Sequence, residues 1–300
     1  MKKECSIKIV GCGFIGKKVG VRLSERKLAV TCFVRSEQSL AECKNYDLDV
    51  VKCDLDEKNI GLADNVLRQF EGSCIAYFAP PPKTGLQDTR MQYFVALLNN
   101  LKITPAKIVL ISTTGVYGDC QGDWIDESRG VNPQADRAHR RLSAETQVQN
   151  YCDEKNIDCV VFRVPGIYSD EKLPVKRISS GEPVVRAEDS GYTNRIHADD
   201  LAAFCVEALS EKVESGVYNC CDGNPSTMND YFMKVADALN ISRPDEISLQ
   251  QAKQELSAGM LSYLAESKRI KNTSLLTNFK TQFKHPNLDA GLKKVREKNA

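Results

Sequence analysis

A short apolar strand that runs directly into a glycine-rich turn constrains this chain most strongly. Residues 6–10 read Ser-Ile-Lys-Ile-Val, the turn reads Gly-Cys-Gly-Phe-Ile-Gly, and an amphipathic segment follows. In such a strand–turn–helix setting, Gly11 permits the tight turn, Gly13 lets a pyrophosphate approach the backbone, and Gly16 lets the helix pack on the strand. The amino end of the helix then faces the phosphates. The pattern therefore predicts dinucleotide binding.

The composition is that of an ordinary globular protein. A chain of 300 residues with 42% hydrophobic residues can bury one large core, or one core with a small second lobe. A net charge of +1 gives no reason to expect nucleic acid or an anionic membrane as the main partner. No signal-peptide pattern follows Met1, and no apolar run reaches the roughly 18 residues that span a bilayer. We expect a cytoplasmic protein.

The cysteines are numerous but scattered. The chain has 12 cysteines and 3 histidines, with no Cys-x-x-Cys motif. Several cysteines lie inside apolar runs, where a free thiol serves as a small buried hydrophobe. Reduced structural thiols are therefore expected, and a metal site is not.

Apolar runs alternate with helix-like stretches through the first half of the chain. After the first strand, the strand-like runs are 28–35, 48–54, 73–79, 106–113 and 157–164. The clearest helical stretches between them are 89–101 and 134–150. This alternation predicts an α/β fold, a doubly wound parallel sheet of the Rossmann type.

The pattern changes after Pro165. Short strand-like pieces such as 216–220 mix with helices at 199–210 and 228–240, and the tail 250–300 reads as helical and charged. We expect residues 1–165 to form the dinucleotide-binding domain. Residues 166–300 are expected to form a smaller α/β substrate lobe, with some segments returning to the first domain.

The tip of the second predicted strand indicates which dinucleotide is bound. It reads Val34-Arg35-Ser36, without the acidic residue that would bind the ribose 2′-hydroxyl of NAD. A guanidinium at this place suits the 2′-phosphate of NADP, so NADP(H) is favoured and NAD(H) stays possible. Alternatively, Arg35 is a solvated loop charge. Asp54, at the end of the third strand, either accepts from the adenine amino group or starts the next turn.

Further segments follow in a recognisable order. They are Ser-Thr-Thr-Gly-Val-Tyr-Gly at 112–118, Arg-Val-Pro-Gly-Ile-Tyr at 163–168, Asn-Arg-Ile-His-Ala-Asp-Asp-Leu at 194–201 and Tyr-Asn-Cys-Cys-Asp-Gly at 218–223. Together with the glycine turn, this set resembles the extended short-chain dehydrogenase/reductases, the NAD-dependent epimerase/dehydratase group. That resemblance implies a small-molecule substrate, with sugar nucleotides as one candidate class, and a monomer or homodimer.

The resemblance also implies catalytic positions, and here the chain departs from the family. Thr113 would bind the substrate oxygen that undergoes redox change. A Tyr-x-x-x-Lys pair should follow on the next long helix, but Arg137 and Arg141 stand in those places. Arginine stays protonated at any working pH, so Arg137 cannot exchange a proton, whereas Arg141 could hold ribose hydroxyls or a phosphate. The chain therefore looks like a member of an atypical branch of the group. Tyr117 either replaces the missing tyrosine as the proton-exchanging phenol or is a packing residue.

Other nucleotide contacts follow from the same resemblance. They comprise Phe14 and Ile15 in the glycine turn, Ala79 and Pro80 after the fourth strand, Ser36, Thr113, and Pro165 and Gly166 after the sixth strand. The run Pro80-Pro81-Pro82 forms either a stiff wall beside the cofactor or merely a rigid loop.

Several residues have competing interpretations. Tyr151 and Lys155 also spell Tyr-x-x-x-Lys, but at the far end of the helix, away from the cofactor. His197 is either structural or catalytic, and Asp199 or Asp200 is the expected N-cap of the following helix. Arg186 and Arg195 either clasp a substrate diphosphate or form surface ion pairs.

Two functions of different classes remain open from the sequence. The first is an NADP(H)-dependent oxidoreductase of the epimerase/dehydratase type, whose proton comes from Tyr117, His197 or water. The second is a cofactor-binding sensor or accessory protein without turnover, which the missing Tyr–Lys pair suggests.

Overall fold

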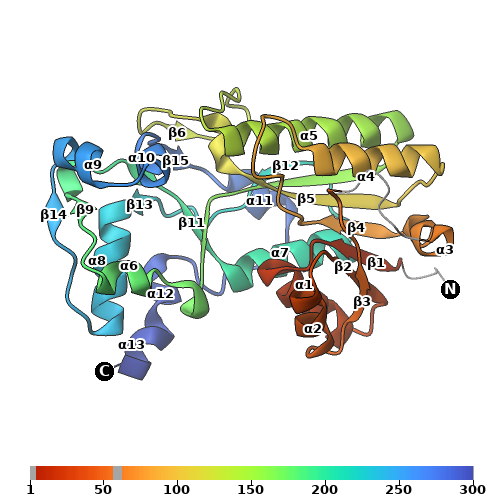
Figure 1. The fold of residues 1–300 in the computed structure, drawn as a ribbon, viewed down its shortest axis with the longest axis horizontal. Coiled ribbons are helices and arrows are strands. Elements are labelled where there is room, and N and C mark those ends of the chain that lie inside the picture. Colours follow the sequence, from red (N-terminus) through yellow and green to blue (C-terminus); the bar gives the residue numbers. More distant parts are fainter. Residues whose placement is uncertain (1–4, 57–62, 300) are drawn as a thin grey trace.

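The computed structural model describes residues 5–56 and 63–299 and contains one large parallel sheet (Figure 1). Its seven strands run in the order β12-β7-β5-β4-β1-β2-β3, and every neighbouring pair is parallel. The strands are β1 (Ile7–Val10), β2 (Val30–Val34), β3 (Asp49–Lys52), β4 (Cys74–Tyr77), β5 (Lys107–Thr113), β7 (Asp158–Val164) and β12 (Gly216–Asn219). The predicted doubly wound sheet is confirmed, and its first six strands end within two residues of the predicted bounds.

Helices cover both faces of the sheet, as buried apolar runs require. The first face is covered by α1 (Phe14–Glu25) and α7 (Ala198–Ser210), and the opposite face by α4 (Thr89–Asn100) and α5 (Asp136–Lys155). Shorter helices are α2 (Glu37–Lys44), α3 (Asp64–Leu67) and α11 (Thr273–Asn278). Each face has its own core, with Val19, Leu23 and Phe204 in one and Phe94 and Val148 in the other.

The strands direct their carboxyl ends toward a second group of elements, at the left of Figure 1. The strand pairs of this lobe are β6 (Trp124–Ile125) with β15 (Arg269–Ile270), β8 (Gly166–Tyr168) with β11 (Arg195–His197), β9 (Val184–Val185) with β14 (Glu246–Ile247), and β10 (Tyr192–Thr193) with β13 (Ser226–Thr227). Its helices are α6 (Val175–Ser179), α8 (Met228–Leu239), α9 (Leu249–Glu255), α10 (Ala258–Leu264), α12 (Leu288–Gly291) and α13 (Lys293–Asn299). A third, smaller core around Phe232 and Val235 holds this lobe together.

Three segments after Pro165 return to the large sheet, and one of them, α11, packs on β12. Strand β12 extends the sheet beside β7, and α7 packs on α1. The tail beyond residue 250 is only partly helical, because β15 interrupts it and pairs with β6. The prediction of a helical tail holds for α9, α10, α11, α12 and α13, and it missed the short strand β15 between α10 and α11.

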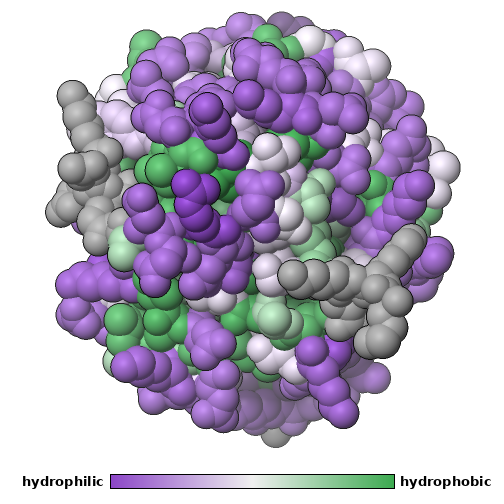
Figure 2. All heavy atoms as spheres, turned by 90° about the vertical axis from the view of Figure 1, so that its right-hand side faces the viewer, coloured by the Kyte–Doolittle hydropathy of each residue, from purple (hydrophilic) through white to green (hydrophobic). Residues whose placement is uncertain are grey.

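The surface away from the second lobe is largely hydrophilic, with small separate hydrophobic patches (Figure 2). Within the described residues, no helix is both long and apolar enough to cross a membrane. All 12 cysteines lie in the described part of the chain. They are free, and each is buried except Cys5.

Candidate cofactor and substrate site

At two of its three glycines, the glycine turn lies too close to other atoms to leave room for a side chain. Gly11 has φ of +90°, and a Cβ placed on it would lie 2.3 Å from the backbone N of Ala79 at the end of β4. A Cβ on Gly16 would lie 3.0 Å from the Gly11 carbonyl oxygen. In contrast, a Cβ on Gly13 meets nothing within 4 Å. The turn therefore packs against β4 at Gly11 and leaves open space at Gly13.

The amino end of α1 is available to an anion. Its N-cap is Gly13, which has no side chain to cap the helix. The first-turn N–H groups, which belong to Phe14, Ile15 and Gly16, have no partner within an α-helix. They carry the positive end of the helix dipole, so this terminus suits a phosphate group.

A cavity of about 230 Å³ opens at the carboxyl ends of β1 to β4. Seven of the predicted nucleotide contacts line it, namely Gly11, Gly13, Arg35, Ser36, Asp54, Ala79 and Pro80. Phe14, Ile15, Gly16, Thr113, Arg141, Pro165 and Gly166 do not line this cavity. Its walls are mostly apolar, with Phe33, Leu55 and Phe78 among them, as in sites that enclose a flat ring.

Arg35 pairs with Asp56, a residue outside the cavity lining that the sequence did not reveal. Asp56 accepts from Arg35 at 2.9 Å, and Arg90 donates to both oxygens of the same carboxylate, at 2.6 and 2.7 Å. Arg90 also donates to the Pro80 carbonyl, and these arginines hold the pKa of Asp56 below its ordinary value. Arg90 lies in the first turn of α4, far in sequence from every motif, so nothing in the chain pointed to it.

The two polar residues predicted beside Arg35 have local roles. Ser36 is the N-cap of α2 and accepts from the Ser39 N–H at 3.1 Å. The Asp54 carboxylate accepts from the Asp56 N–H at 2.9 Å, so it shapes the turn after β3. Both residues still line the cavity.

Thr113 and α5 lie side by side at the end of β5. The Thr113 hydroxyl accepts from the Gly115 N–H at 3.2 Å, and Gly115 lies against Ala138 of α5. Arg141 donates to the carbonyl of Ala79 at 3.2 Å and so reaches the cavity wall from the α5 side. Burial lowers the pKa of Arg141, and in the described residues it has no ion-pair partner.

Arg137 points to the second lobe instead. It donates to the Ser262 hydroxyl at 2.6 Å, and its guanidinium lies 4.1 Å from the centre of the Tyr263 ring. Both of these residues belong to α10. The two arginines therefore share one helix but contact different parts of the molecule.

Tyr117 is buried in a polar network rather than exposed to the cavity. Its hydroxyl donates to Asn219 Oδ1 at 2.8 Å, and the guanidinium of Arg163 lies 4.8 Å from its ring centre. Burial raises the pKa of Tyr117 above its ordinary value. Arg163 in turn pairs with Glu145 at 2.8 Å, and Glu145 accepts from the Ser112 hydroxyl. These contacts connect α5, β5 and β7 directly beneath Thr113.

The second Tyr-x-x-x-Lys sequence lies away from the cavity, as predicted. Tyr151 and Lys155 occupy the last turns of α5, and Tyr151 donates to the Ile103 carbonyl at 2.7 Å. Ile103 precedes β5, so this contact lies at the amino edge of the sheet, opposite the cofactor cavity.

His197 begins α7, where the sequence predicted an aspartate cap. His197 Nδ1 accepts from the Asp199 N–H at 3.2 Å and makes His197 the N-cap. Asp199 instead pairs with Lys18 and Arg22 of α1, each at 3.2 Å. Asp200 accepts from the backbone N–H groups of Lys284 and His285. The expected aspartate cap was wrong because both carboxylates have stronger tertiary partners.

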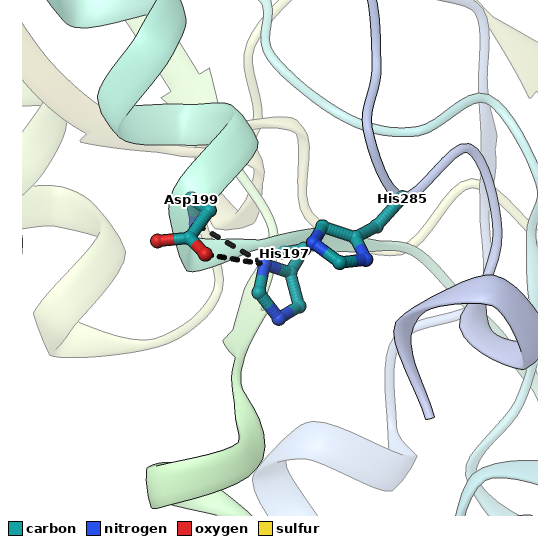
Figure 3. Close-up of side chains that lie close together, drawn as sticks. All are labelled: His197, Asp199 and His285. Carbon is teal, nitrogen blue, oxygen red and sulfur yellow. Dashed lines mark hydrogen bonds and ion pairs between the residues drawn. The ribbon is translucent and has the colours of Figure 1, made fainter. Parts of the chain in front are cut away.

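His197, Asp199 and His285 form a compact cluster (Figure 3), with ligand atoms within 4.8 Å of one another. The two imidazole rings stack with centres 3.8 Å apart. However, His197 Nδ1 already receives an N–H, and two cationic side chains neutralise the Asp199 carboxylate. The cluster lies where α1, α7 and the tail meet, and the Nε2 atoms of His197 and His285 are buried there without a hydrogen-bond partner among the described residues.

The cluster predicts a pH-dependent stability. Burial, with a smaller contribution from His285, lowers the pKa of His197 from 6.5 to about 4. Between about pH 4 and pH 6.5 the unfolded chain binds a proton at His197 that the folded chain does not bind. The free energy of unfolding therefore falls as the pH falls through this range. Above pH 6.5 the ring is neutral in both states and does not change the stability. The expected loss from this group at pH 5 is about 2 kcal/mol.

Urea unfolding at pH 5 and pH 7 checks this expectation. His197→Asn keeps a side-chain acceptor at the N-cap but removes the titrating ring. When the pH is lowered from 7 to 5, the free energy of unfolding of the variant should therefore fall by about 2 kcal/mol less than that of the wild type. An unchanged difference would mean that other groups, such as Asp199 and Asp200, carry the pH dependence.

Arg186 and Arg195, the two candidate substrate-binding arginines, differ in their exposure to solvent. Arg186 is exposed and pairs with Asp189 at 2.7 Å, which matches the surface ion-pair interpretation. Arg195 is buried, donates to the hydroxyls of Ser226 and Thr193, and stacks on Tyr231. For Arg195 the surface ion-pair alternative was therefore wrong, because the fold buries it in β11. Gly166 pairs with Arg195 across β8 and β11, and its N–H donates to the Asn194 carbonyl.

Solved structures share this architecture. A functionally unknown conserved protein from Silicibacter pomeroyi superposes with a TM-score of 0.84 at 21% identity, over 98% of this chain and 99% of that one. A UDP-glucose 4-epimerase from Thermotoga maritima, solved with UDP-glucose, has a TM-score of 0.76 at 16% identity, over 97% of each chain. The UDP-glucose 4-epimerase of Thermus thermophilus, in complex with NAD, has a TM-score of 0.73 at 18% identity, over 97% of this chain and 99% of that one. At these identities the likeness establishes the fold.

Sequence relatives cover most of the chain as well. Protein YeeZ of Escherichia coli K12 is 21% identical over 81% of this chain and 86% of its own. An Arabidopsis thaliana epimerase family protein, the chloroplastic SDR39U1 homolog, is 22% identical over 81% of this chain and 73% of its own. The family described as NAD dependent epimerase/dehydratase matches residues 7–221, which hold the glycine turn, the residues that line the cavity, Thr113 and α7. The chain belongs to the NAD-dependent epimerase/dehydratase family.

Proposed function

We propose that this protein is an NADP(H)-dependent oxidoreductase of the epimerase/dehydratase type, acting on a small carbonyl or hydroxyl substrate such as a sugar nucleotide. The observation that carries the proposal is the cavity at the carboxyl ends of β1 to β4, with the glycine turn on one side and Arg35 on the other. Solved neighbours that bind NAD or UDP-glucose support the ligand classes.

The residues present fit a dinucleotide. Open space at Gly13 and the uncapped amino end of α1 suit a pyrophosphate, and the apolar walls suit an adenine ring. When bound, the nicotinamide would accept or supply hydride. Arg141, which reaches the Ala79 carbonyl, would hold the ribose on the nicotinamide side.

The preference for the phosphorylated dinucleotide depends on the arginines around Asp56. Arg35 stands at the tip of β2 where NAD-binding chains carry an acidic residue, and Arg90 approaches from α4. Arg35 and Arg90 both donate to the Asp56 carboxylate. A guanidinium can bind phosphate oxygens with the same two-pronged geometry that it uses for a carboxylate. A 2′-phosphate could therefore replace Asp56 as the partner in part of these contacts.

Arg35→Ala is expected to weaken NADPH binding by about 10- to 100-fold, because a charge-assisted phosphate contact contributes about 1.5–3 kcal/mol. NADH, which lacks the phosphate, should bind with nearly unchanged affinity. Nucleotide fluorescence titration measures both constants. Arg129→Ala, a change at a half-exposed arginine outside the cavity lining, is the matched control. Equal weakening of both nucleotides would contradict the assigned role of Arg35.

The reaction would rely on positioning more than on a built-in proton relay. Thr113 would hydrogen-bond the substrate oxygen, and Arg137 and Arg141 would stay protonated. Tyr117 is buried and bonded to Asn219, and His197 is buried at the α7 N-cap. Of the three donors that the sequence left open, water is therefore the one that we propose for the proton.

Consumption of NADPH in the presence of small carbonyls and UDP-sugars tests the function. Thr113→Ala should lower kcat by about 10- to 100-fold with little change in NADPH affinity, because it removes one positioning hydrogen bond. Thr277→Ala, which changes an exposed threonine on α11, should leave kcat unchanged. Unchanged turnover in Thr113→Ala would remove Thr113 from the site.

A second candidate is a cofactor-binding protein without turnover. The observation that favours it is the cavity lining, in which the described residues include neither tyrosine nor histidine. Tight NADPH binding without turnover on any of these substrates would support this candidate, and robust turnover on one of them would end it.

A further inference from the structure

Two thiols meet at the amino edge of the large sheet, where β1 and β4 begin. Cys5 lies two residues before the start of β1, Cys74 begins β4, and their sulfur atoms lie 3.0 Å apart. The β1–β4 register pairs Ile7 with Cys74. Because alternate residues of an extended chain point to the same face, Cys5, Ile7 and Cys74 project from one side of the sheet. Both cysteines are free.

This arrangement needs little movement to form a covalent bond. The sulfur atoms are only about 1 Å farther apart than in a disulfide. The Cys74 N–H donates to the Ser6 carbonyl at 2.9 Å, so the sheet ladder holds the two strands in this register. Cys5 is half-buried, so a small oxidant can reach its sulfur, whereas Cys74 is only 6% exposed.

The electrostatics differ between the two thiols. The hydrogen bond from Cys74 lowers the pKa of Cys5 to about 7, with a smaller contribution from Lys107. The same contact and burial raise the pKa of Cys74. Near neutral pH, Cys5 therefore supplies the reactive thiolate and Cys74 keeps its proton.

We propose that Cys5 and Cys74 are a peroxide-sensitive pair that closes into a reversible disulfide. The Cys5 thiolate attacks a hydroperoxide oxygen, the O–O bond breaks, and Cys5 becomes a sulfenic acid while hydroxide leaves. The Cys74 sulfur then attacks the Cys5 sulfur, the S–O bond breaks, and water leaves with the proton of Cys74. The two thiols lose two electrons, and hydrogen peroxide is reduced to two molecules of water.

The other cysteines provide an internal contrast. Cys152 and Cys159 are also close enough for their thiols to share a hydrogen bond, but both are buried. That hydrogen bond, together with burial, raises the pKa of Cys152. Cys12 in the glycine turn and Cys32 in β2 are likewise buried, and contact with Cys32 together with burial raises the pKa of Cys12. Buried thiols of this kind are inert, so Cys5 is the cysteine at which oxidation starts.

The position of the pair determines what the bridge would change. It joins the amino ends of β1 and β4, whereas the cofactor cavity lies at the carboxyl ends of the same strands. The closed loop from residue 5 to residue 74 contains β1, β2 and β3, so the bridge restricts the unfolded chain. Oxidation should therefore raise Tm and leave NADPH affinity within about twofold of the reduced protein.

Peptide mass spectrometry after hydrogen peroxide treatment tests the proposal. The full chain is oxidised, unfolded, alkylated with iodoacetamide and digested, with and without prior dithiothreitol. The expected result is a peptide pair joined through Cys5 and Cys74, lighter by two hydrogens, which dithiothreitol separates. Peptides with Cys152 and Cys159 should be alkylated throughout and serve as the matched control.

Two single variants separate the steps. In Cys74→Ser, dimedone should label a persistent sulfenic acid on Cys5, and no bridge should form. In Cys5→Ser, neither bridge nor dimedone label should appear, and peroxide should no longer raise Tm. Thermal melts of the reduced variants check that each still folds.

Three results would overturn the proposal. They are alkylation of Cys5 and Cys74 after peroxide treatment, preferential bridging of Cys152 to Cys159, and bridging that persists between other cysteines in Cys5→Ser. None of these outcomes depends on cofactor preference or turnover, so this proposal and the proposed function fail independently.

Discussion

Replacing Gly11 by alanine is expected to destabilise the fold and to abolish nucleotide binding. The backbone at Gly11 has φ of +90°, and a Cβ there would lie 2.3 Å from Ala79 N and 2.5 Å from Ala79 Cα. These neighbours are backbone atoms of the central sheet, so they cannot rotate away. Left-handed strain and overpacking together cost roughly 2–4 kcal/mol. For a chain of 300 residues, Tm should fall by roughly 3–6 °C.

Gly13→Ala is the matched control, because it adds the same methyl group to the same turn. Gly13 has φ of −82°, and its Cβ would meet nothing within 4 Å, so stability should change by less than about 0.5 kcal/mol. The methyl group would instead occupy the open space beside the helix terminus. NADPH affinity should fall by at least about 10-fold, because the backbone then cannot approach the pyrophosphate.

Thermal melts and nucleotide fluorescence titrations of both variants check this pair of expectations. A wild-type Tm in Gly11→Ala would show that the turn relaxes away from β4. Wild-type NADPH binding in Gly13→Ala would place the pyrophosphate elsewhere and remove the main support for the proposed cofactor site.

Removal of Glu145 is expected to have the largest effect on stability outside the glycine turn. Its carboxylate is 1% exposed, pairs with Arg163 at 2.8 Å and accepts from the Ser112 hydroxyl. Glu145→Ala leaves a buried guanidinium without its counter-charge, which costs about 3–5 kcal/mol. Urea unfolding monitored by circular dichroism measures the loss.

A double variant distinguishes the missing charge from lost packing. Glu145→Leu with Arg163→Met removes both charges and keeps apolar volume, so it should recover most of the stability that Glu145→Ala loses. Asp237→Ala, which breaks an exposed pair with Arg243, should cost less than about 1 kcal/mol. If the double variant were as unstable as Glu145→Ala, the contribution of Glu145 would be packing rather than charge pairing.

Local patterns were sufficient for the sheet and the glycine turn. The apolar runs and the spacing of Gly11, Gly13 and Gly16 act through neighbouring residues, so they can be recognised without a structure. The tip of β2 was equally readable, because the end of a parallel strand is a fixed place in such a fold. In contrast, the N-cap of α7 was misjudged, since Asp199 and Asp200 have partners in α1 and in the tail that lie far away in sequence.

Patterns along the chain were enough to predict the α/β class, the approximate bounds of the first six strands and the dinucleotide signature. The folded chain was needed to see that Asp56 joins Arg35 to Arg90, that Tyr117 packs against Asn219 and Arg163, and that Cys5 contacts Cys74. The physical reason is the range of the interactions. Periodicity and turn chemistry act over a few residues, whereas these pairings depend on which strands and helices become neighbours when the sheet forms.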